Sequence, residues 1–424
     1  MKLIWNEIKK IINIKVLLLL GIITVMYYLL FLNIDLYPNG YPATTNCELS
    51  KDLIQRVGVS IEPEERVVLD EVYDEWVPIW NQMILEDKEF CETYGIDSWE
   101  TFIERWIELS NVVSEYNRQV QSGVLTNDEL EQKVEYQTYV ALENRRNELF
   151  FNSHKDEAFM YQSIEYIKDI YDNFGDFNLS EEDWKEYWTK EQEYYLEAGI
   201  TPTKQYEGRL KEIYTRDGLS LLPEETVQYF TEKLPYFAIL LAISCLVVIV
   251  PFLVKDRLSH MESLLLTTKV GRTLIKKQGI AVFLSSTFLC LLQAIVFYTV
   301  LHIHEIAPFH NCLMTSIITI TWWFDLTFLQ YMLVTIAMAI CFGVATGMIA
   351  FVVSKLSSNY VTAIAYSIPI GILFVLFCRK VFDMPFYMLE EGSKYREFYW
   401  LIGFIVITVG VVLAMIRHEK RREL

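Results

Sequence analysis

The sequence predicts an all-α membrane protein with six transmembrane helices and a mainly helical extracellular domain between the first and second of them. Apolar residues gather in runs of about 20, the length that crosses a bilayer as a helix. Acidic residues gather between the first two runs, because residues 34–233 hold 44 of the 55 Asp and Glu but only 18 of the 37 Lys and Arg. No run alternates apolar and polar residues for long enough to indicate a sheet.

Hydropathy and charge divide the chain, since loops rich in Lys and Arg stay on the cytoplasmic side of a membrane. We expect an amphipathic cytoplasmic-surface helix at 1–15, spans at 16–33, 234–254, 279–302, 326–353, 360–378 and 398–416, outer segments at 34–233, 303–325 and 379–397, and cytoplasmic segments at 255–278 and 417–424. The net charge is −26 over residues 34–233 and +8 over the remainder. The chain therefore combines a basic membrane part with one strongly acidic domain.

The first 15 residues, MKLIWNEIKKIINIK, place apolar and basic side chains on opposite faces of a helix, as in helices that lie on a membrane surface. The charged start of a signal peptide has a similar composition. The apolar run that follows is longer than a signal core and contains no small-residue cleavage site. We therefore expect it to remain as the first span, with the N-terminus inside.

Helix-capping patterns recur in the acidic block. Ser98 opens a predicted helix towards Gln121, Thr126-Asn-Asp-Glu129 is a capping box before a helix through Asn152, and Ser180 opens a helix that ends before Gly199. Cys47 and Cys91 are the only cysteines of the block. Whether a disulfide joins them is left open by their spacing.

Sequence motifs exclude several kinds of site. No segment reads G-x-x-x-x-G-K-[ST], so no nucleotide or other cofactor is expected on this chain, and ATP-driven work would need an ATPase on another polypeptide. The spans contain almost no ionisable residues, although ion-coupled carriers pair their cation inside the membrane. No nucleophile elbow or zinc-protease signature is present, so we expect no catalytic residue.

Two further patterns have ordinary structural explanations. Three histidines fall in one outer segment with a carboxylate and a thiol, but their spacing is not H-E-x-x-H and Pro308 interrupts any common helical face, so we expect no metal. These residues are His302, His304, Glu305, His310 and Cys312. Gly343-Val-Ala-Thr-Gly347 is a small-xxx-small motif, which serves either a bundle interior or a dimer seam.

The basic segment 255–278 resembles the coupling loop in the membrane subunit of a type-2 ABC exporter (the type V exporter fold). The match lies in an acidic residue, a group of leucines, two threonines and a basic residue: Glu262, Leu264, Leu265, Leu266, Thr267, Thr268 and Arg272. The N-terminal segment is similar to the connecting helix of that family, through Trp5, Glu7, Lys9 and Lys10. Family members often have Glu-x-x-x-Gly before the leucines, where this chain has Lys255 and Ser259.

The resemblance implies a permease subunit that contacts a separate ABC ATPase through those residues and works as a homodimer or with a second permease. It implies the plasma membrane of a bacterium, of the Gram-positive kind in which some members have a large outer domain. An acidic outer domain would concentrate cationic peptides, which suggests export of, or protection against, peptides or amphipathic compounds. No nucleic-acid partner is expected. The alternative is a membrane-anchored receptor or assembly scaffold that acts through its extracellular helical domain.

Overall fold

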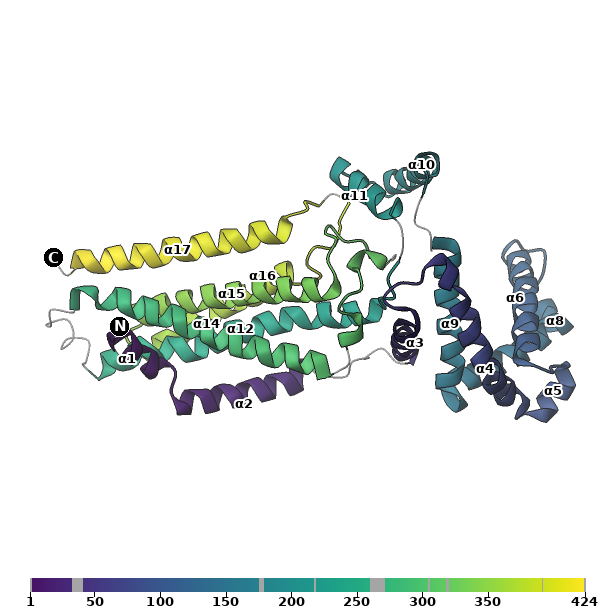
Figure 1. Cartoon of the computed structure of the whole chain (residues 1–424), viewed down its shortest axis with the longest axis horizontal. Coiled ribbons are helices and arrows are strands. Elements are labelled where there is room, and N and C mark those ends of the chain that lie inside the picture. The colour runs from purple at the N-terminus through teal and green to yellow at the C-terminus, as the bar shows by residue number, and fades with distance from the viewer. Residues whose placement is uncertain are drawn as a thin grey trace. The chain divides into compact units, whose positions relative to one another are not determined.

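The computed structural model of the chain consists of helices and their connections (Figure 1). It describes residues 2–32, 41–174, 179–216, 219–259, 271–303, 306–317, 320–390 and 392–422. Within these ranges, β-type pairing is limited to three isolated bridges, Ser60 with Ser220, Leu313 with Thr327 and Trp322 with Tyr387. The predicted all-α class is confirmed for this part of the chain.

Within the described ranges, six helices are long and apolar enough to cross a membrane, which is the number of candidate spans that the sequence predicts. They are α2 (Ile14–Phe31), α12 (Glu224–Leu258), α14 (Gly271–Ile303), α15 (Phe328–Leu356), α16 (Tyr360–Val381) and α17 (Arg396–Arg422). A short helix, α1 (Lys2–Ile11), precedes them. Several begin at side-chain caps, since Asn13, Thr327 and Asn359 each accept hydrogen bonds from backbone N–H groups in the first turn.

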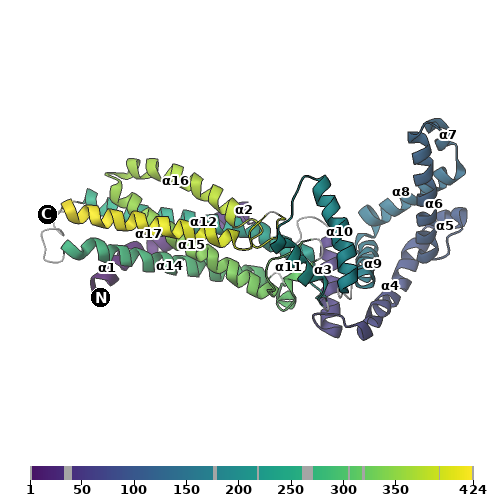
Figure 2. The same cartoon turned by 90° about the horizontal axis from the view of Figure 1, so that it is seen from above.

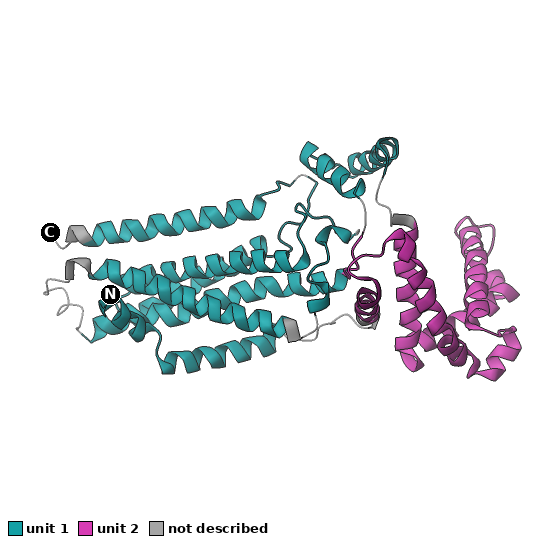
Figure 3. Cartoon of the chain, viewed as in Figure 1, with its two compact units in different colours: residues 1–36, 179–216, 224–424 teal, residues 37–178, 217–223 magenta. Residues whose placement is uncertain are grey.

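The chain divides into two compact units (Figure 3). Unit 1 contains residues 1–36, 179–216 and 224–424, and unit 2 contains residues 37–178 and 217–223. The acidic block 34–233 is therefore shared between the units, because residues 179–216 belong to the unit that holds the six apolar helices.

The centre of unit 1 is formed by α12 and α15. In their most apolar stretches 78% and 67% of the residues are buried, against 50% in α14 and 17% in each of α2, α16 and α17. Helix α15 approaches its neighbours through Gly343 and Gly347. A Cβ atom added to Gly347 would lie 2.1 Å from the Ser286 hydroxyl of α14, and one added to Gly343 would lie 2.7 Å from the Cys290 sulfur. The small-xxx-small motif thus packs inside the bundle.

Replacing Gly347 with alanine should destabilise unit 1 by about 1–3 kcal/mol, the usual cost of overpacking a close contact. The matched control is Gly410→Ala on α17, where an added Cβ meets no atom within 4 Å. The readout is the thermal unfolding midpoint of the purified protein in detergent. Ser286→Gly should restore part of the loss, and equal midpoints for Gly347→Ala and Gly410→Ala would contradict the packing.

Unit 2 is a helical domain with its own aromatic core. Its helices are α3 (Tyr41–Val57), α4 (Val67–Leu85), α5 (Lys88–Tyr94), α6 (Trp99–Gln121), α7 (Asn127–Glu131), α8 (Val134–Glu148) and α9 (Lys155–Phe174), with a π-helical turn at Leu149–Ser153. Trp80 is fully buried, and its indole Nε1 donates to the Glu157 carbonyl at 2.9 Å. The Tyr161 ring lies 5.2 Å from Trp80 and 5.3 Å from Trp99, centroid to centroid.

The predicted helix starts in unit 2 are confirmed, because Ser98 and the Thr126 capping box open helices. The single helix predicted from Thr126 through Asn152 is wrong, because α7 ends at Glu131 and the backbone is extended at Lys133 before α8 begins. The Gln137 side chain donates to the Glu131 carbonyl, which as the last carbonyl of α7 has no donor from within the helix.

The structure has no disulfide between Cys47 and Cys91, and the Cys91 thiol donates to the Ile84 carbonyl.

Within unit 1, α10 (Glu181–Glu197) and α11 (Lys204–Tyr214) pack against the connections between the apolar helices. Ser180 caps α10 as predicted. Trp184, Tyr195 and Tyr206 share one buried cluster with Trp323 and Met388. The Arg209 guanidinium, whose side chain is 8% exposed, donates to both oxygens of Asp325 at 2.7 and 3.2 Å and to the Trp322 carbonyl at 3.1 Å. Arg216 adds a further bond to Asp325 at 2.7 Å.

Asp325→Asn should lower the thermal unfolding midpoint at pH 7, because it leaves the buried Arg209 cation without its bidentate partner. Hydrogen bonds from Arg209 outweigh burial and hold the pKa of Asp325 below its usual value. The stabilisation is therefore present above about pH 4, the ordinary Asp pKa, and is lost as the pH falls through the lower folded-state pKa. The difference between wild type and Asp325→Asn should shrink in that acid range. Glu193→Gln on the exposed face of α10 is the control, and a pH-independent difference would count against the ion pair.

Candidate functional site

One end of unit 1 brings together the segments that the sequence singled out. Figures 1 and 2 both place α1, the last turn of α12, the first turn of α14 and the two chain termini at this end, which is called the terminal end below. The last turn of α15 contributes to it through hydrogen bonds with Arg257 and an ion pair between Lys355 and Glu419. The other end of the bundle, with α10, α11 and the Asp325 ion pairs, is called the opposite end.

Helix α1 packs on the bundle by one face. Glu7 and Ile11 are each 2% exposed, whereas Trp5 on the other face is 58% exposed. Asn13 joins α1 to α2, because its Oδ1 accepts from the backbone of Lys15 and Val16 at 3.1 Å while its Nδ2 donates to the Lys10 carbonyl at 3.2 Å. The Lys9 ammonium lies 5.4 Å from the centroid of the Trp5 ring. Trp5 and Lys9 together form an accessible aromatic and cationic surface.

Lys10 links α1 to the last turn of α12. Its Nζ lies 3.1 Å from Glu7 Oε1 and 3.2 Å from Asp256 Oδ2. Burial disfavours the charged ammonium, but hydrogen bonds and the charges of Glu7 and Asp256 outweigh it and raise the pKa of Lys10. The ammonium is therefore charged at neutral pH. Asp256 is three residues before the last described residue of this segment, Ser259, so α1 is held to the start of the predicted coupling segment.

Two further ties connect the last turns of α12, α15 and α17. The Arg257 guanidinium donates to the carbonyls of Ser357 and, at 2.9 Å, Lys355. Both lie at the C-terminal end of α15, where backbone carbonyls have no donor from within the helix. A cation there also interacts favourably with the helix dipole. Lys355 Nζ lies 3.1 Å from Glu419 Oε1 on α17. The terminal end is thus braced by ionic contacts between helices that are far apart in the sequence.

The predicted connecting-helix residues form two pairs. Glu7 is buried and bonds Lys10, which fixes α1 to α12 through Asp256, while Trp5 and Lys9 are exposed. Of the predicted coupling residues, Glu262, Leu264, Leu265, Leu266, Thr267 and Thr268 lie outside the described residues. Arg272 lies in the first turn of α14, and only its backbone is described.

The sequence did not predict the contacts between the helix ends. It used the charges of these residues only to orient the chain in a membrane, and they are Asp256, Arg257, Lys355 and Glu419. A weak signal was available, since Asp256 stands alone among basic residues in the last turn of an apolar helix. Among the described residues, no group of three or more His, Cys, Asp or Glu could hold a metal ion, and His304 and Glu305 lie outside them.

Comparison with known proteins adds no relative, because no protein-family model, curated protein or solved structure matches the chain.

Arg257→Met should destabilise the protein by roughly 1–3 kcal/mol, because it removes charge-assisted hydrogen bonds to the end of α15. Lys255→Met is the matched control, since Lys255 is exposed on the same last turn of α12. Thermal unfolding in detergent gives the comparison. If both variants unfold at the wild-type temperature, Arg257 does not brace α12 against α15.

Proposed function

We propose that this chain is the membrane-spanning permease subunit of an ATP-driven exporter, energised by a separate ATPase that contacts the terminal end. The observation that supports this most is the ion pair between Lys10 and Asp256. It makes α1 and the last turn of α12 one mechanical element at the start of the segment that resembles a coupling loop. The chain has no nucleotide-binding motif, so the driving force would enter through that element from another protein.

Charge supports a cytoplasmic terminal end. Residues 1–15, 255–278, 354–359 and 417–424 hold 15 Lys and Arg but five Asp and Glu. An excess of Lys and Arg in short loops is typical of the cytoplasmic side. Unit 2, with 31 acidic and 11 basic residues, would then lie outside the cell together with the opposite end of the bundle. The proposed membrane is the plasma membrane of a Gram-positive bacterium.

In this mechanism, closure of the ATPase dimer pushes on α1 and the coupling segment. The push is delivered to α12 through Lys10 and Asp256 and to α15 through Arg257, so both central helices move with the terminal end. A permease of this kind acts as a pair, either with a second copy or with a related subunit. The outer unit, near −20, would raise the local concentration of cationic peptides, the proposed ligands.

Purification of the tagged chain from its native membrane tests the proposal. Wild type should retain a protein with a P-loop, and the eluate should hydrolyse ATP. Arg272→Glu and the double variant Trp5→Ala/Lys9→Glu should each lower the retained ATPase at least tenfold. Arg272 belongs to the segment that resembles a coupling loop, and the Trp5 ring and the Lys9 ammonium are exposed on α1. Mass spectrometry and phosphate release are the measurements.

Lys380→Glu is the control for a charge reversal at the opposite end of the bundle, where Lys380 is exposed. All variants must elute as the wild type does in size-exclusion chromatography. Absence of any P-loop protein, or equal retention in all variants, would exclude the permease proposal. A cationic peptide that still binds under those conditions would favour the receptor or scaffold alternative, whose active part is the helical unit 2.

A further inference from the structure

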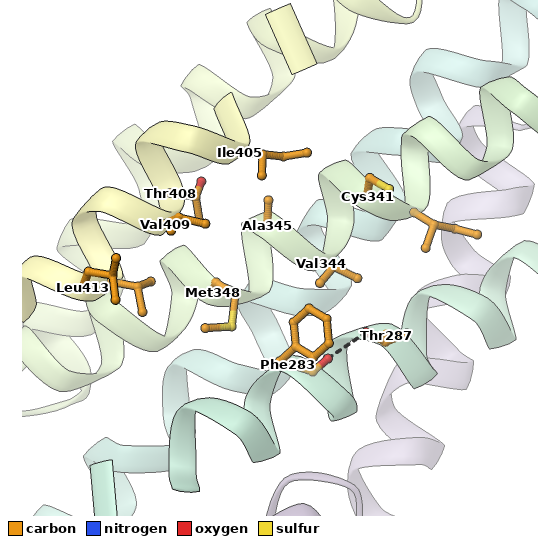
Figure 4. A pocket seen from close by; sticks show the side chains of 12 residues that line it. Phe283, Thr287, Cys341, Val344, Ala345, Met348, Ile405, Thr408, Val409 and Leu413 are labelled. Carbon is orange, nitrogen blue, oxygen red and sulfur yellow. Dashed lines mark hydrogen bonds between the residues drawn. The ribbon is translucent and has the colours of Figure 1, made fainter. Parts of the chain in front are cut away.

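A groove of about 440 Å³ runs between α14, α15 and α17 (Figure 4). Its lining includes Phe283 and Thr287 from α14, Val344 and Met348 from α15, and Val409 from α17. All three helices belong to the set that is apolar enough to cross a membrane. The groove therefore lies along the flank of the proposed spans.

The wall of the groove suits a hydrocarbon chain. Its two hydroxyl groups are already satisfied within their own helices, since Thr287 donates to the Phe283 carbonyl at 2.9 Å and Thr408 donates to the Phe404 carbonyl at 2.9 Å. Figure 4 shows apolar side chains, among them Val344 and Ala345, lining the groove between the two threonines. The hydroxyl protons of Thr287 and Thr408 are therefore not available to a ligand, and burying polar groups of a ligand among the apolar side chains of the groove would cost free energy.

Two basic side chains lie beyond the terminal end of the groove. Lys276 precedes Phe283 by seven residues, or about 10 Å, and the spacing keeps both on one face of α14. Arg417 follows Leu413 of the groove wall by one turn of α17. Both side chains are exposed, and neither forms an ion pair with a carboxylate of the described residues. Lys355 on the intervening helix is different, because Glu419 neutralises it.

We propose that this groove binds one anionic phospholipid, with an acyl chain between α14, α15 and α17 and its phosphate group at Lys276 and Arg417. Paired basic residues between helices at the cytoplasmic surface are suited to anionic headgroups. A neutral lipid would fill the apolar groove equally well but would gain nothing from the two cations. The site is separate from the coupling surface, and only its assignment to the cytoplasmic leaflet rests on the proposed orientation.

Native mass spectrometry of the full chain tests this site without any ATPase. The protein is equilibrated in detergent with equal amounts of palmitoyl-oleoyl phosphatidylglycerol and palmitoyl-oleoyl phosphatidylcholine, and the lipids retained per chain are counted. Wild type should retain phosphatidylglycerol in preference to phosphatidylcholine. Lys276→Ala and Arg417→Ala should each weaken that retention about fivefold, and the double variant about 25-fold, since each basic residue near an anionic surface contributes about 1 kcal/mol.

Two pairs of variants separate the headgroup from the acyl chain. Val409→Trp fills the groove from α17 and should lower retention of both lipids, whereas Val411→Trp, on an exposed residue outside the groove, should not. Lys15→Ala at the start of α2 controls for general attraction by a basic residue. Equal retention of the two lipids by wild type, wild-type retention by the double variant, or a lipid-free dimer would each overturn the proposal.

Discussion

The close approach of α15 to α14 and α12 is the contact on which the bundle depends. In a bilayer the lipid tails are as apolar as the helices, so association relies on packing, and small residues allow the backbones to come near each other. Gly343 and Gly347 provide this on α15, against Cys290 and Ser286 of α14. With α12 and α15 buried at the centre, the other spans have one side left for lipid, and their exposed apolar side chains follow from that arrangement.

Ion pairs and charge-assisted hydrogen bonds connect segments at both ends of unit 1. At the terminal end, Lys10 and Arg257 connect the last turn of α12 to α1 and α15. At the opposite end, Asp325 forms ion pairs with Arg209 and Arg216, which fix α11 to the connection between α14 and α15. These charged side chains lie at or beyond the ends of the apolar helices, and charges near a membrane surface are far less costly than charges in the hydrocarbon region.

Much of the fold could be predicted because the signals are local. Runs of apolar residues mark the six helices, and Ser98, Thr126 and Ser180 cap helices as their patterns indicate. Contacts between distant residues could not be predicted in this way. Nothing in the sequence near α10 shows that Trp184 packs with Trp323 and Met388. The sequence therefore predicts that α10 and α11 belong to the acidic domain. Charge counts likewise orient a chain in a membrane without showing that Lys10 pairs with Asp256.

Helix α12 runs without interruption from the residue that follows unit 2 to the last turn that contains Asp256. Unit 2 ends at residue 223, after Leu221 has donated to the Val59 carbonyl, and α12 begins at the next residue. Its 35 residues form a rod of about 52 Å at the usual rise per residue. A rotation of its first turn must reappear at its last turn unless the rod bends at Pro235 or Pro251. Bending at these two prolines therefore decides how much of a rotation at Glu224 reaches Asp256 at the other end of the helix.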